Sequence, residues 1–267
     1  MSNIENTYVW LLRQNAATIH EITEQCREHN EAATAKYVYD KVITPLISQG
    51  RVQRIRRGLY TAVDSLTGKP AADPIIVASK IRSEYYLGYH AALTLHGAAY
   101  SASTQTQVCV KPRNSFRKFN VGGYTIKPVY TGDTETNIQA LRYRGGSIMV
   151  CGKERLLIEC LDKPQHVGGW EQTLKSLETL GGVEYSQIPR LLSLLGNQKQ
   201  TRVTGYVLEL LRQYSVYHRH LPEDVLKTLE GMVEGQPTYL VNGVPGPLDR
   251  RWRLYVPEYF VGLLRGV

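Results

Sequence analysis

The most regular pattern of hydrophobic and polar positions lies in the first quarter of the chain. Residues 18–30 and 34–49 place apolar side chains three or four positions apart, which predicts two helices with one buried face each. The first begins Thr18-x-x-Glu21, the spacing of a capping box at a helix N-terminus. Residues 51–63 alternate apolar and polar side chains around one glycine, which predicts a β-hairpin. Two helices followed by a hairpin are the order of a winged helix-turn-helix domain.

The second helix is predicted to present a polar face to solvent. Its buried face would consist of Ala35, Val38, Tyr39, Val42 and Leu46. The exposed face and early turns would carry Thr34, Lys36, Tyr37 and Lys41. Such a face can enter the major groove of DNA, which is about 12 Å wide, and contact base edges. Pro45 lies near the end of the pattern, so we expect the helix to kink there or to end near Thr44 and restart.

The predicted hairpin is strongly basic. Four arginines fall within seven residues, namely Arg51, Arg54, Arg56 and Arg57. Residues 1–31 carry two arginines against five glutamates, net −3, whereas residues 32–70 carry seven Lys or Arg against two aspartates, net +5. Cations at a hairpin tip reach phosphates more readily than base edges. The hairpin is therefore expected to position the protein on DNA, and the helix to select the sequence.

Length and total charge extend this picture. The chain has 267 residues, enough for two domains, because about 100–200 residues per domain is usual. Residues 65–74 resemble a linker, which predicts a winged helix over residues 1–70 and a larger domain over residues 71–267. The formal net charge of +8 favours a polyanionic partner, and double-stranded DNA is the first candidate.

Helix and strand patterns alternate through the larger domain, which predicts an α+β fold. Helices are expected at residues 75–82, 89–96, 154–161, 169–180, 185–195, 201–214 and 222–233. Strands are expected at residues 85–87 and 106–111, in a segment 119–129 that turns at Gly122-Gly123, and at residues 139–143 and 147–151, which turn at Gly145-Gly146. Those after residue 105 are expected to be antiparallel. A final hairpin is expected from residues 238–241 and 252–256.

Three short segments resemble a known family. They are residues 56–60 (RRGLY) after the winged helix, residues 89–97 (YHAALTLHG), and residues 154–161 (ERLLIECL) with Gly168-Gly169 behind them. Together, and in this order along nearly the whole chain, they resemble the AbiEi family of antitoxins. No single segment would be specific alone. Family members often carry aspartate where Glu159 stands, a change that preserves the charge.

The resemblance implies a transcriptional autorepressor from a type IV toxin-antitoxin or phage-defence locus. In such proteins the winged helix binds inverted repeats in the promoter, and the larger domain is needed for action against a nucleotidyltransferase toxin. The expected partners are therefore double-stranded promoter DNA and a toxin of this class.

A second basic region lies in the larger domain. It consists of Lys111, Arg113, Arg117, Lys118 and Lys127, with aromatic residues interleaved and no acidic residue between positions 111 and 127. It is either a mobile, solvated hairpin or a second polyanion surface that contacts flanking DNA or the RNA-directed toxin. A third, weaker candidate consists of Arg250, Arg251 and Arg253, beside a tryptophan, Trp252, that is expected in the core.

An enzyme-like cluster is present near residue 159. Glu154, Glu159, Asp162 and Lys163 could be imagined as a metal-dependent nuclease site. Such a site needs carboxylates from separate elements, whereas Glu154, Arg155 and Glu159 follow one another along one helix. They are expected to pair on its solvated face. No motif for phosphate binding, dinucleotide binding or hydrolysis accompanies them, so we expect no enzymatic activity and no cofactor.

The histidines and cysteines also show no spacing that is typical of a metal site. His90 and His96 are six positions apart on one predicted helix and do not share a face, so packed structural histidines are expected. The four cysteines match no zinc spacing and are expected to be reduced and buried. No apolar run approaches the roughly 20 residues of a membrane span, and no basic segment followed by an apolar one begins the chain, so a cytoplasmic location is expected.

The sequence as a whole predicts a sequence-specific DNA-binding repressor with antitoxin character. Two alternatives remain. One is an adaptor whose winged helix binds protein instead of DNA. The other is a metal-dependent nucleic-acid-processing enzyme that uses the Glu159 region.

Overall fold

The computed structural model describes residues 3–265. Helices and mixed sheets give the α+β fold that the sequence predicts. The chain divides into two compact units. The first comprises Met1–Leu87, Thr104–Thr134 and Arg142–Ile148, and the second comprises Gly88–Ser103, Glu135–Leu141 and Met149–Val267. The first unit continues past residues 65–74, so the compact units do not coincide with the predicted division at residue 70.

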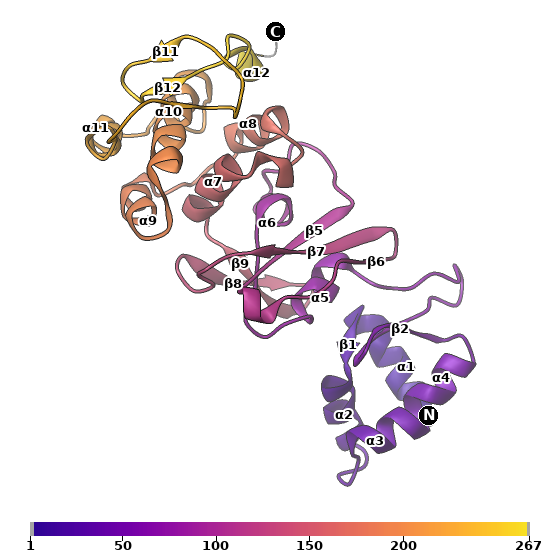
Figure 1. Cartoon of the computed structure of the whole chain (residues 1–267). Helices are drawn as coiled ribbons and strands as arrows, with labels where there is room; N and C mark the ends of the chain where they lie inside the picture. The colour runs from indigo at the N-terminus through magenta and orange to yellow at the C-terminus, as the bar shows by residue number, and fades with distance from the viewer. Residues whose placement is uncertain (1–2, 266–267) are drawn as a thin grey trace. The chain divides into compact units, whose positions relative to one another are not determined.

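A winged helix forms the N-terminal part of the first unit (Figure 1). Its helices are α1 Asn3–Gln14, α2 Ile19–Arg27, α3 Ala35–Val38 and α4 Thr44–Ser48, with a π-helical turn at Tyr39–Ile43 between the last two. Its strands are β1 Ala17–Thr18, β2 Val52–Arg56 and β3 Leu59–Ala62, in the order β1-β3-β2. The predicted pair of helical segments and the hairpin are confirmed, and α1 is an addition that the sequence pattern did not predict.

The capping box predicted at the start of α2 is present. The Thr18 hydroxyl accepts the Glu21 amide at 3.3 Å, and the Glu21 carboxylate accepts the Thr18 amide at 2.8 Å. Two backbone donors that the first turn of a helix leaves without partners are thereby satisfied. The Ile19 amide donates to the carbonyl of Gly58 at 2.9 Å, so the turn of the hairpin is tied to the start of the same helix.

A π turn accommodates Pro45 in the second helical segment. The Thr44 amide donates to the Tyr39 carbonyl five residues earlier, and α4 then starts with Pro45 in its first turn, where no amide hydrogen is needed. Burial departs from the prediction, which assumed one uninterrupted α-helix. Ala35 and Tyr39 are exposed, and the buried side chains are Val38, Val42, Ile43 and Leu46.

The winged helix has a hydrophobic core of its own. Its largest fully buried members are Leu11, Ile22, Ile43 and Leu46, and every member lies between residues 4 and 62. The Tyr8 hydroxyl in α1 donates to the carbonyl of Val63 at 2.8 Å, which ties the first helix to the end of the hairpin. These residues bury their apolar surface against one another.

A six-stranded mixed sheet follows the winged helix. Its strands are β4 Tyr86–Leu87, β5 Gln105–Val110, β6 Phe119–Val121, β7 Tyr124–Tyr130, β8 Ile138–Tyr143 and β9 Gly146–Cys151, in the order β6-β7-β5-β4-β9-β8. Before it, α5 Pro74–Ser79 begins at Asp73, whose carboxylate accepts the amides of Ile75 and Ile76 at 2.9 and 3.2 Å. This helix, with proline in its first turn, is confirmed.

The pairing of β5 with β7 corrects the predicted antiparallel arrangement. The two strands are parallel, with Gln105 opposite Thr125 and Val110 opposite Tyr130. β6 is a short strand paired antiparallel with β7 and does not neighbour β5. The chain therefore reverses direction twice between β5 and β7, which leaves the two strands pointing the same way.

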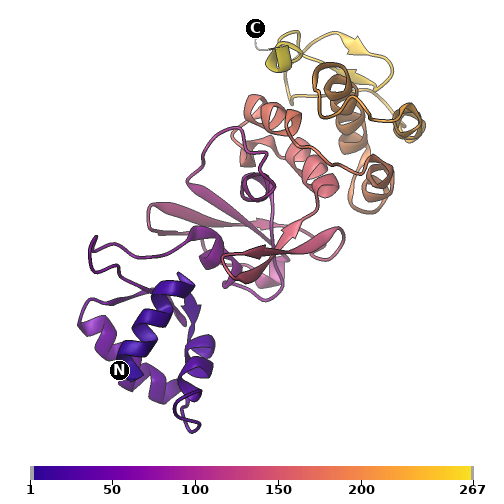
Figure 2. The same ribbon diagram turned by 180° about the vertical axis from the view of Figure 1, so that it is seen from behind.

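The second unit contains most of the remaining helices (Figure 2). They are α6 Tyr89–Leu95, α7 Lys153–Asp162, α8 Trp170–Glu178, α9 Ile188–Leu195, α10 Gln198–Tyr214, α11 Glu223–Gly231 and α12 Gly262–Arg265. The predicted final hairpin was wrong. β10 Thr238–Tyr239 and β12 Leu254–Tyr255 are parallel, and a third strand, β11 Leu248–Asp249, pairs antiparallel with β12. Two residues are too few for alternation to have revealed β11.

The buried His218 leads to a prediction about acid stability. Its Nε2 donates to the carbonyl of Leu177 at 2.7 Å, and its Nδ1 lies 2.8 Å from the hydroxyl of Tyr185, whose pKa burial raises to about 12. Burial lowers the pKa of His218, so the neutral ring accepts the Tyr185 proton in the folded state. The unfolded chain then binds more protons, and stability is lost as pH falls below the ordinary histidine value of about 6.5.

We expect the free energy of unfolding in urea to decrease from pH 7.5 to pH 5. The expected slope is up to about 1.4 kcal/mol per pH unit for each histidine that is neutral only when folded. His218→Gln should make this dependence shallower. His20→Gln, at an exposed position, is the matched control. A profile that His218→Gln leaves unchanged would contradict the prediction.

Candidate nucleic-acid interface

The polar face predicted for the second helical segment is exposed. Lys36, Tyr37 and Lys41 all lie at the surface, and the Tyr37 side chain is 41% exposed. Thr34 is exposed as well and its hydroxyl caps α3 by accepting the Tyr37 amide at 3.2 Å. The structure adds Tyr39, 40% exposed, to this surface. The start of the helical segment thus presents two lysines, two phenols and a hydroxyl, groups that can donate to or accept from base edges.

Two of the four wing arginines are free to meet a backbone phosphate. Arg54 and Arg57 are exposed, the first in β2 and the second in the turn. Arg51 instead donates two hydrogen bonds to the Glu5 carboxylate, both at 2.8 Å, and its guanidinium lies 3.9 Å from the centroid of the Tyr8 ring. The hydrogen bond to Glu5 raises the pKa of Arg51. This arginine ties the residue before β2 to α1.

Arg56 is half-buried, unlike its neighbours in the wing. Its guanidinium carbon lies 5.8 Å from the centroid of the Phe116 ring and 5.4 Å from that of Phe119. Burial, and after it the charge of Arg82, lowers the pKa of Arg56. Its Nη1 has no hydrogen-bond acceptor among residues 3–265. No sequence pattern links positions 56 and 116, so sequence reasoning missed this contact.

The second basic region is only partly available to a ligand. Arg113 pairs with Glu84 at 2.8 Å, and Lys127 donates to the Gln105 side chain at 2.6 Å. Burial, with a contribution from Lys118, lowers the pKa of Lys127. Lys111 is half-buried, whereas Arg117 and Lys118 are exposed.

Of the aromatic residues of this region, Phe116 and Phe119 face inward, whereas Tyr124 is 37% exposed. Phe116 is 7% exposed and packs edge-to-face on Phe119, with their centroids 6.4 Å apart. Neither ring is presented as a stacking platform for bases, a role that needs an exposed face. The rings instead hold Arg56, which places the loop of residues 111–118 beside the wing within the first unit.

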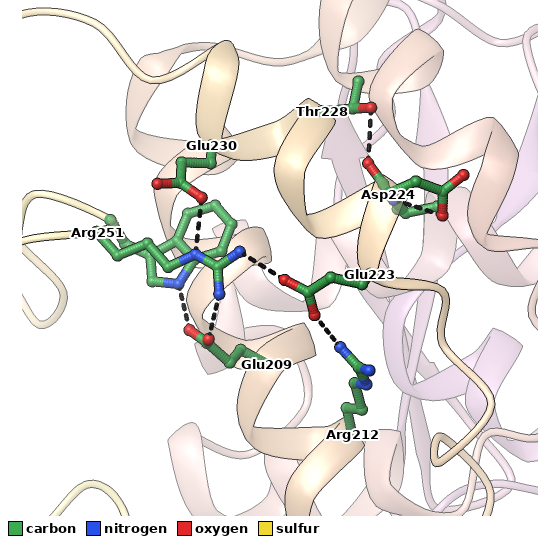
Figure 3. A network of polar contacts seen from close by, with 9 residues as sticks. Glu209, Arg212, Glu223, Asp224, Thr228, Glu230 and Arg251 are labelled. Atoms are coloured by element: carbon green, nitrogen blue, oxygen red, sulfur yellow. Dashed lines mark hydrogen bonds and ion pairs between the residues drawn. The ribbon is translucent and has the colours of Figure 1, made fainter.

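The third basic candidate is mostly structural (Figure 3). Arg251 contacts the carboxylates of Glu209, Glu223 and Glu230 at 2.5, 3.2 and 3.0 Å. Trp252 is fully buried, as predicted, and its Nε1 donates to Glu209 at 2.6 Å. Arg253 donates to the carbonyl of Gly235 at 2.8 Å, whereas Arg250 is exposed. Arg251 already has three carboxylate partners and is not available to a polyanion.

The Glu154 to Lys163 cluster departs from the predicted solvated face. The Arg155–Glu159 ion pair exists at 2.8 Å, but its side chains are only 3% and 15% exposed. Glu154 is 8% exposed and accepts the Glu184 amide at 2.8 Å. The prediction assumed an isolated helix, whereas residues 136–137 and 184 cover this part of α7. A polar cavity of about 410 Å³ borders Glu154.

Other candidate ligands are occupied by internal contacts. His90 donates to the carbonyl of Ser101 at 2.7 Å and His96 to that of Cys151 at 2.8 Å, which confirms two structural histidines. All four cysteines are buried. Within residues 3–265, no three His, Cys, Asp or Glu side chains are grouped to hold a metal ion. The same residues include no helix long and apolar enough to cross a membrane.

Comparison with known proteins finds a similar fold and does not identify a ligand. No family model and no curated protein matches this chain. Among solved structures, the crystal structure of RV2827C protein from Mycobacterium tuberculosis is similar, with a TM-score of 0.62. The alignment covers 94% of this chain and 89% of that chain at 16% identity. Similarity at this identity supports the fold alone. The resemblance to the AbiEi family stays a prediction.

Proposed function

We propose that the protein is a sequence-specific DNA-binding repressor of its own promoter. The observation that carries the proposal is the joint exposure of Lys36, Tyr37 and Lys41 at the start of the helical segment and of Arg54 and Arg57 on the adjoining wing. A winged helix places these two surfaces against the major groove and the neighbouring backbone. The net charge of +8 supports association with a polyanion.

Two kinds of contact are assigned to these residues. The helix face, with Thr34 at its start, discriminates bases, because amines, hydroxyls and phenols can donate to or accept from base edges. Arg54 and Arg57 neutralise phosphates and act on all sequences alike.

The test is a mobility-shift titration of the full chain on the DNA upstream of its own gene. A scrambled duplex of equal length and composition is the control. We expect the upstream DNA to be bound at least about a thousandfold more tightly at physiological salt. Equal affinity for the two duplexes would contradict sequence-specific repression. Absence of binding to either duplex would favour the alternative that the winged helix binds protein.

The wing makes a separate prediction about salt. Each phosphate contact contributes about 0.9 to the slope of log K against log salt concentration on duplex DNA. Arg54→Ala and Arg57→Ala should each reduce the slope by about this amount, on operator and scrambled DNA alike. Arg250→Ala, which removes an exposed arginine of the second unit, is the matched control and should leave the slope unchanged. An unaltered slope in both wing variants would assign the hairpin a structural role.

We infer in addition that the protein acts as an antitoxin. This part rests on the resemblance of residues 89–97 and 154–161, which form α6 and much of α7 in the second unit. Co-expression of the full chain with a nucleotidyltransferase encoded beside it, scored by growth, is the test. Failure to restore growth while the promoter is still repressed would leave a plain repressor.

A further inference from the structure

Arg56 departs from the geometry expected of an arginine in a wing. In a regular strand, residues 54 and 56 would point to the same face. The pairing of β2 with β3 contains a bulge, since Arg54 is opposite Tyr60 and Arg56 is opposite Leu59. A bulge locally reorients the side chains of its strand. Arg54 accordingly remains exposed, whereas Arg56 is half-buried.

The guanidinium of Arg56 is held by a cluster of rings and cations. Phe116 and Phe119 pack edge-to-face, and both centroids are within 6 Å of the Arg56 guanidinium, the range of a cation–π interaction. Arg82 lies on the same Phe116 ring, with its guanidinium carbon 5.7 Å from the centroid. Arg82 also donates to the carbonyls of Asn114 and Ser115 at 2.8 and 2.5 Å, which fixes the loop that carries Phe116 and leads to Phe119 at the start of β6.

The position of Arg56 costs free energy that an arginine exposed for phosphate binding would not lose. Two cations share one aromatic cluster, and Nη1 of Arg56 has no acceptor within residues 3–265. Buried donors without partners are uncommon and call for an explanation. The exposed Arg57, one residue along, can reach a phosphate without any of these costs.

We propose that Arg56 is a positioning residue of the wing, clamped on Phe116 and Phe119 so that Arg54 and Arg57 reach the phosphates, and that it neutralises no phosphate itself. The wing is then fixed at both ends of its turn, because the Gly58 carbonyl accepts the Ile19 amide at 2.9 Å on the other side. The DNA part of this statement rests on the proposed function. The clamp itself does not.

The clamp is tested without DNA by amide hydrogen exchange over residues 52–62. Phe119→Leu removes one of the two rings at a half-buried position and leaves the wing sequence unchanged. We expect exchange in these residues to be about two- to fivefold faster, the factor set by one exposed cation–π contact. Arg56→Ala should accelerate it similarly, and Arg57→Ala should not. Exchange unchanged in both Phe119→Leu and Arg56→Ala would overturn the clamp.

Arg56→Lys separates positioning from phosphate contact. Lysine keeps the charge and loses the planar group that lies on the rings. If Arg56 positions the wing, Arg56→Lys and Arg56→Ala should both weaken DNA binding about two- to fivefold, and the two variants should have the same salt slope as each other. If Arg56 contacts a phosphate, Arg56→Ala should reduce the slope by about 0.9 and lysine should restore it, which would overturn the proposal. A wild-type chain that binds no DNA would refute the proposed function, while hydrogen exchange would still decide the clamp.

Discussion

Tyr37→Ala is expected to weaken binding to the operator by about 1–3 kcal/mol and binding to a scrambled duplex by much less. Tyr37 is 41% exposed at the start of the helical segment, next to Lys36, and its amide is held by Thr34. Its backbone is therefore fixed while its phenol remains available to a base edge. Lys36→Ala is expected to fall in the same range. The measurement is a titration of each variant on both duplexes at one salt concentration.

Tyr217→Ala is the matched control for this substitution. Tyr217 is 51% exposed in the second unit, so the variant removes the same side chain from a surface to which no DNA contact is assigned. Its affinity for both duplexes should equal that of the unaltered chain. If Tyr37→Ala weakened both duplexes equally, the helix would contribute contacts without discrimination. If it weakened neither, the exposed face would have another partner.

Local signals in the sequence predicted the winged helix well. The capping box at Thr18 and Glu21 involves atoms three residues apart, and the hairpin turn at Gly58 needs only its positive φ of 76°. Such features are decided within one turn of chain. The π turn at Tyr39–Ile43 could not be predicted from the pattern of apolar residues, because the spacing of its side chains is that of neither a regular α-helix nor a strand. Tyr39 was therefore assigned to the wrong face.

Features that depend on distant residues could not be predicted. The parallel pairing of β5 with β7 depends on the order of strands in the sheet, in which β5 lies between β4 and β7. The alternation of apolar residues along one strand does not show which strands are its neighbours. The burial of Arg155 depends on a covering segment at residues 136–137. In the candidate interface, charge clustering identified all four wing arginines without separating the two exposed ones from Arg51 and Arg56, whose partners are Glu5 and Phe116.

Gly205→Ala is expected to lower the free energy of unfolding by about 2 kcal/mol or more. A Cβ at Gly205 would lie 2.0 Å from Cζ3 of Trp252 and 2.4 Å from its Cε3. The ring has little room to move, because it is fully buried and its Nε1 donates to Glu209 on the same helix, α10. Replacing glycine by alanine gains about 1 kcal/mol in helix propensity. We expect the clash with the Trp252 ring to exceed this gain, because these contacts hold the ring in place.

Gly231→Ala supplies the matched control, because Gly231 is also helical, in α11, and a Cβ there meets nothing within 4 Å. That variant should be as stable as the unaltered chain or more stable, by up to about 1 kcal/mol, in urea unfolding. Combining Gly205→Ala with Trp252→Phe should cost less than the sum of the two single changes, because the smaller ring vacates part of the space that the new methyl group needs. Equal stability of Gly205→Ala and Gly231→Ala would mean that Trp252 does not pack on α10. If the effects of Gly205→Ala and Trp252→Phe were fully additive, the destabilisation by Gly205→Ala would not come from a clash with Trp252.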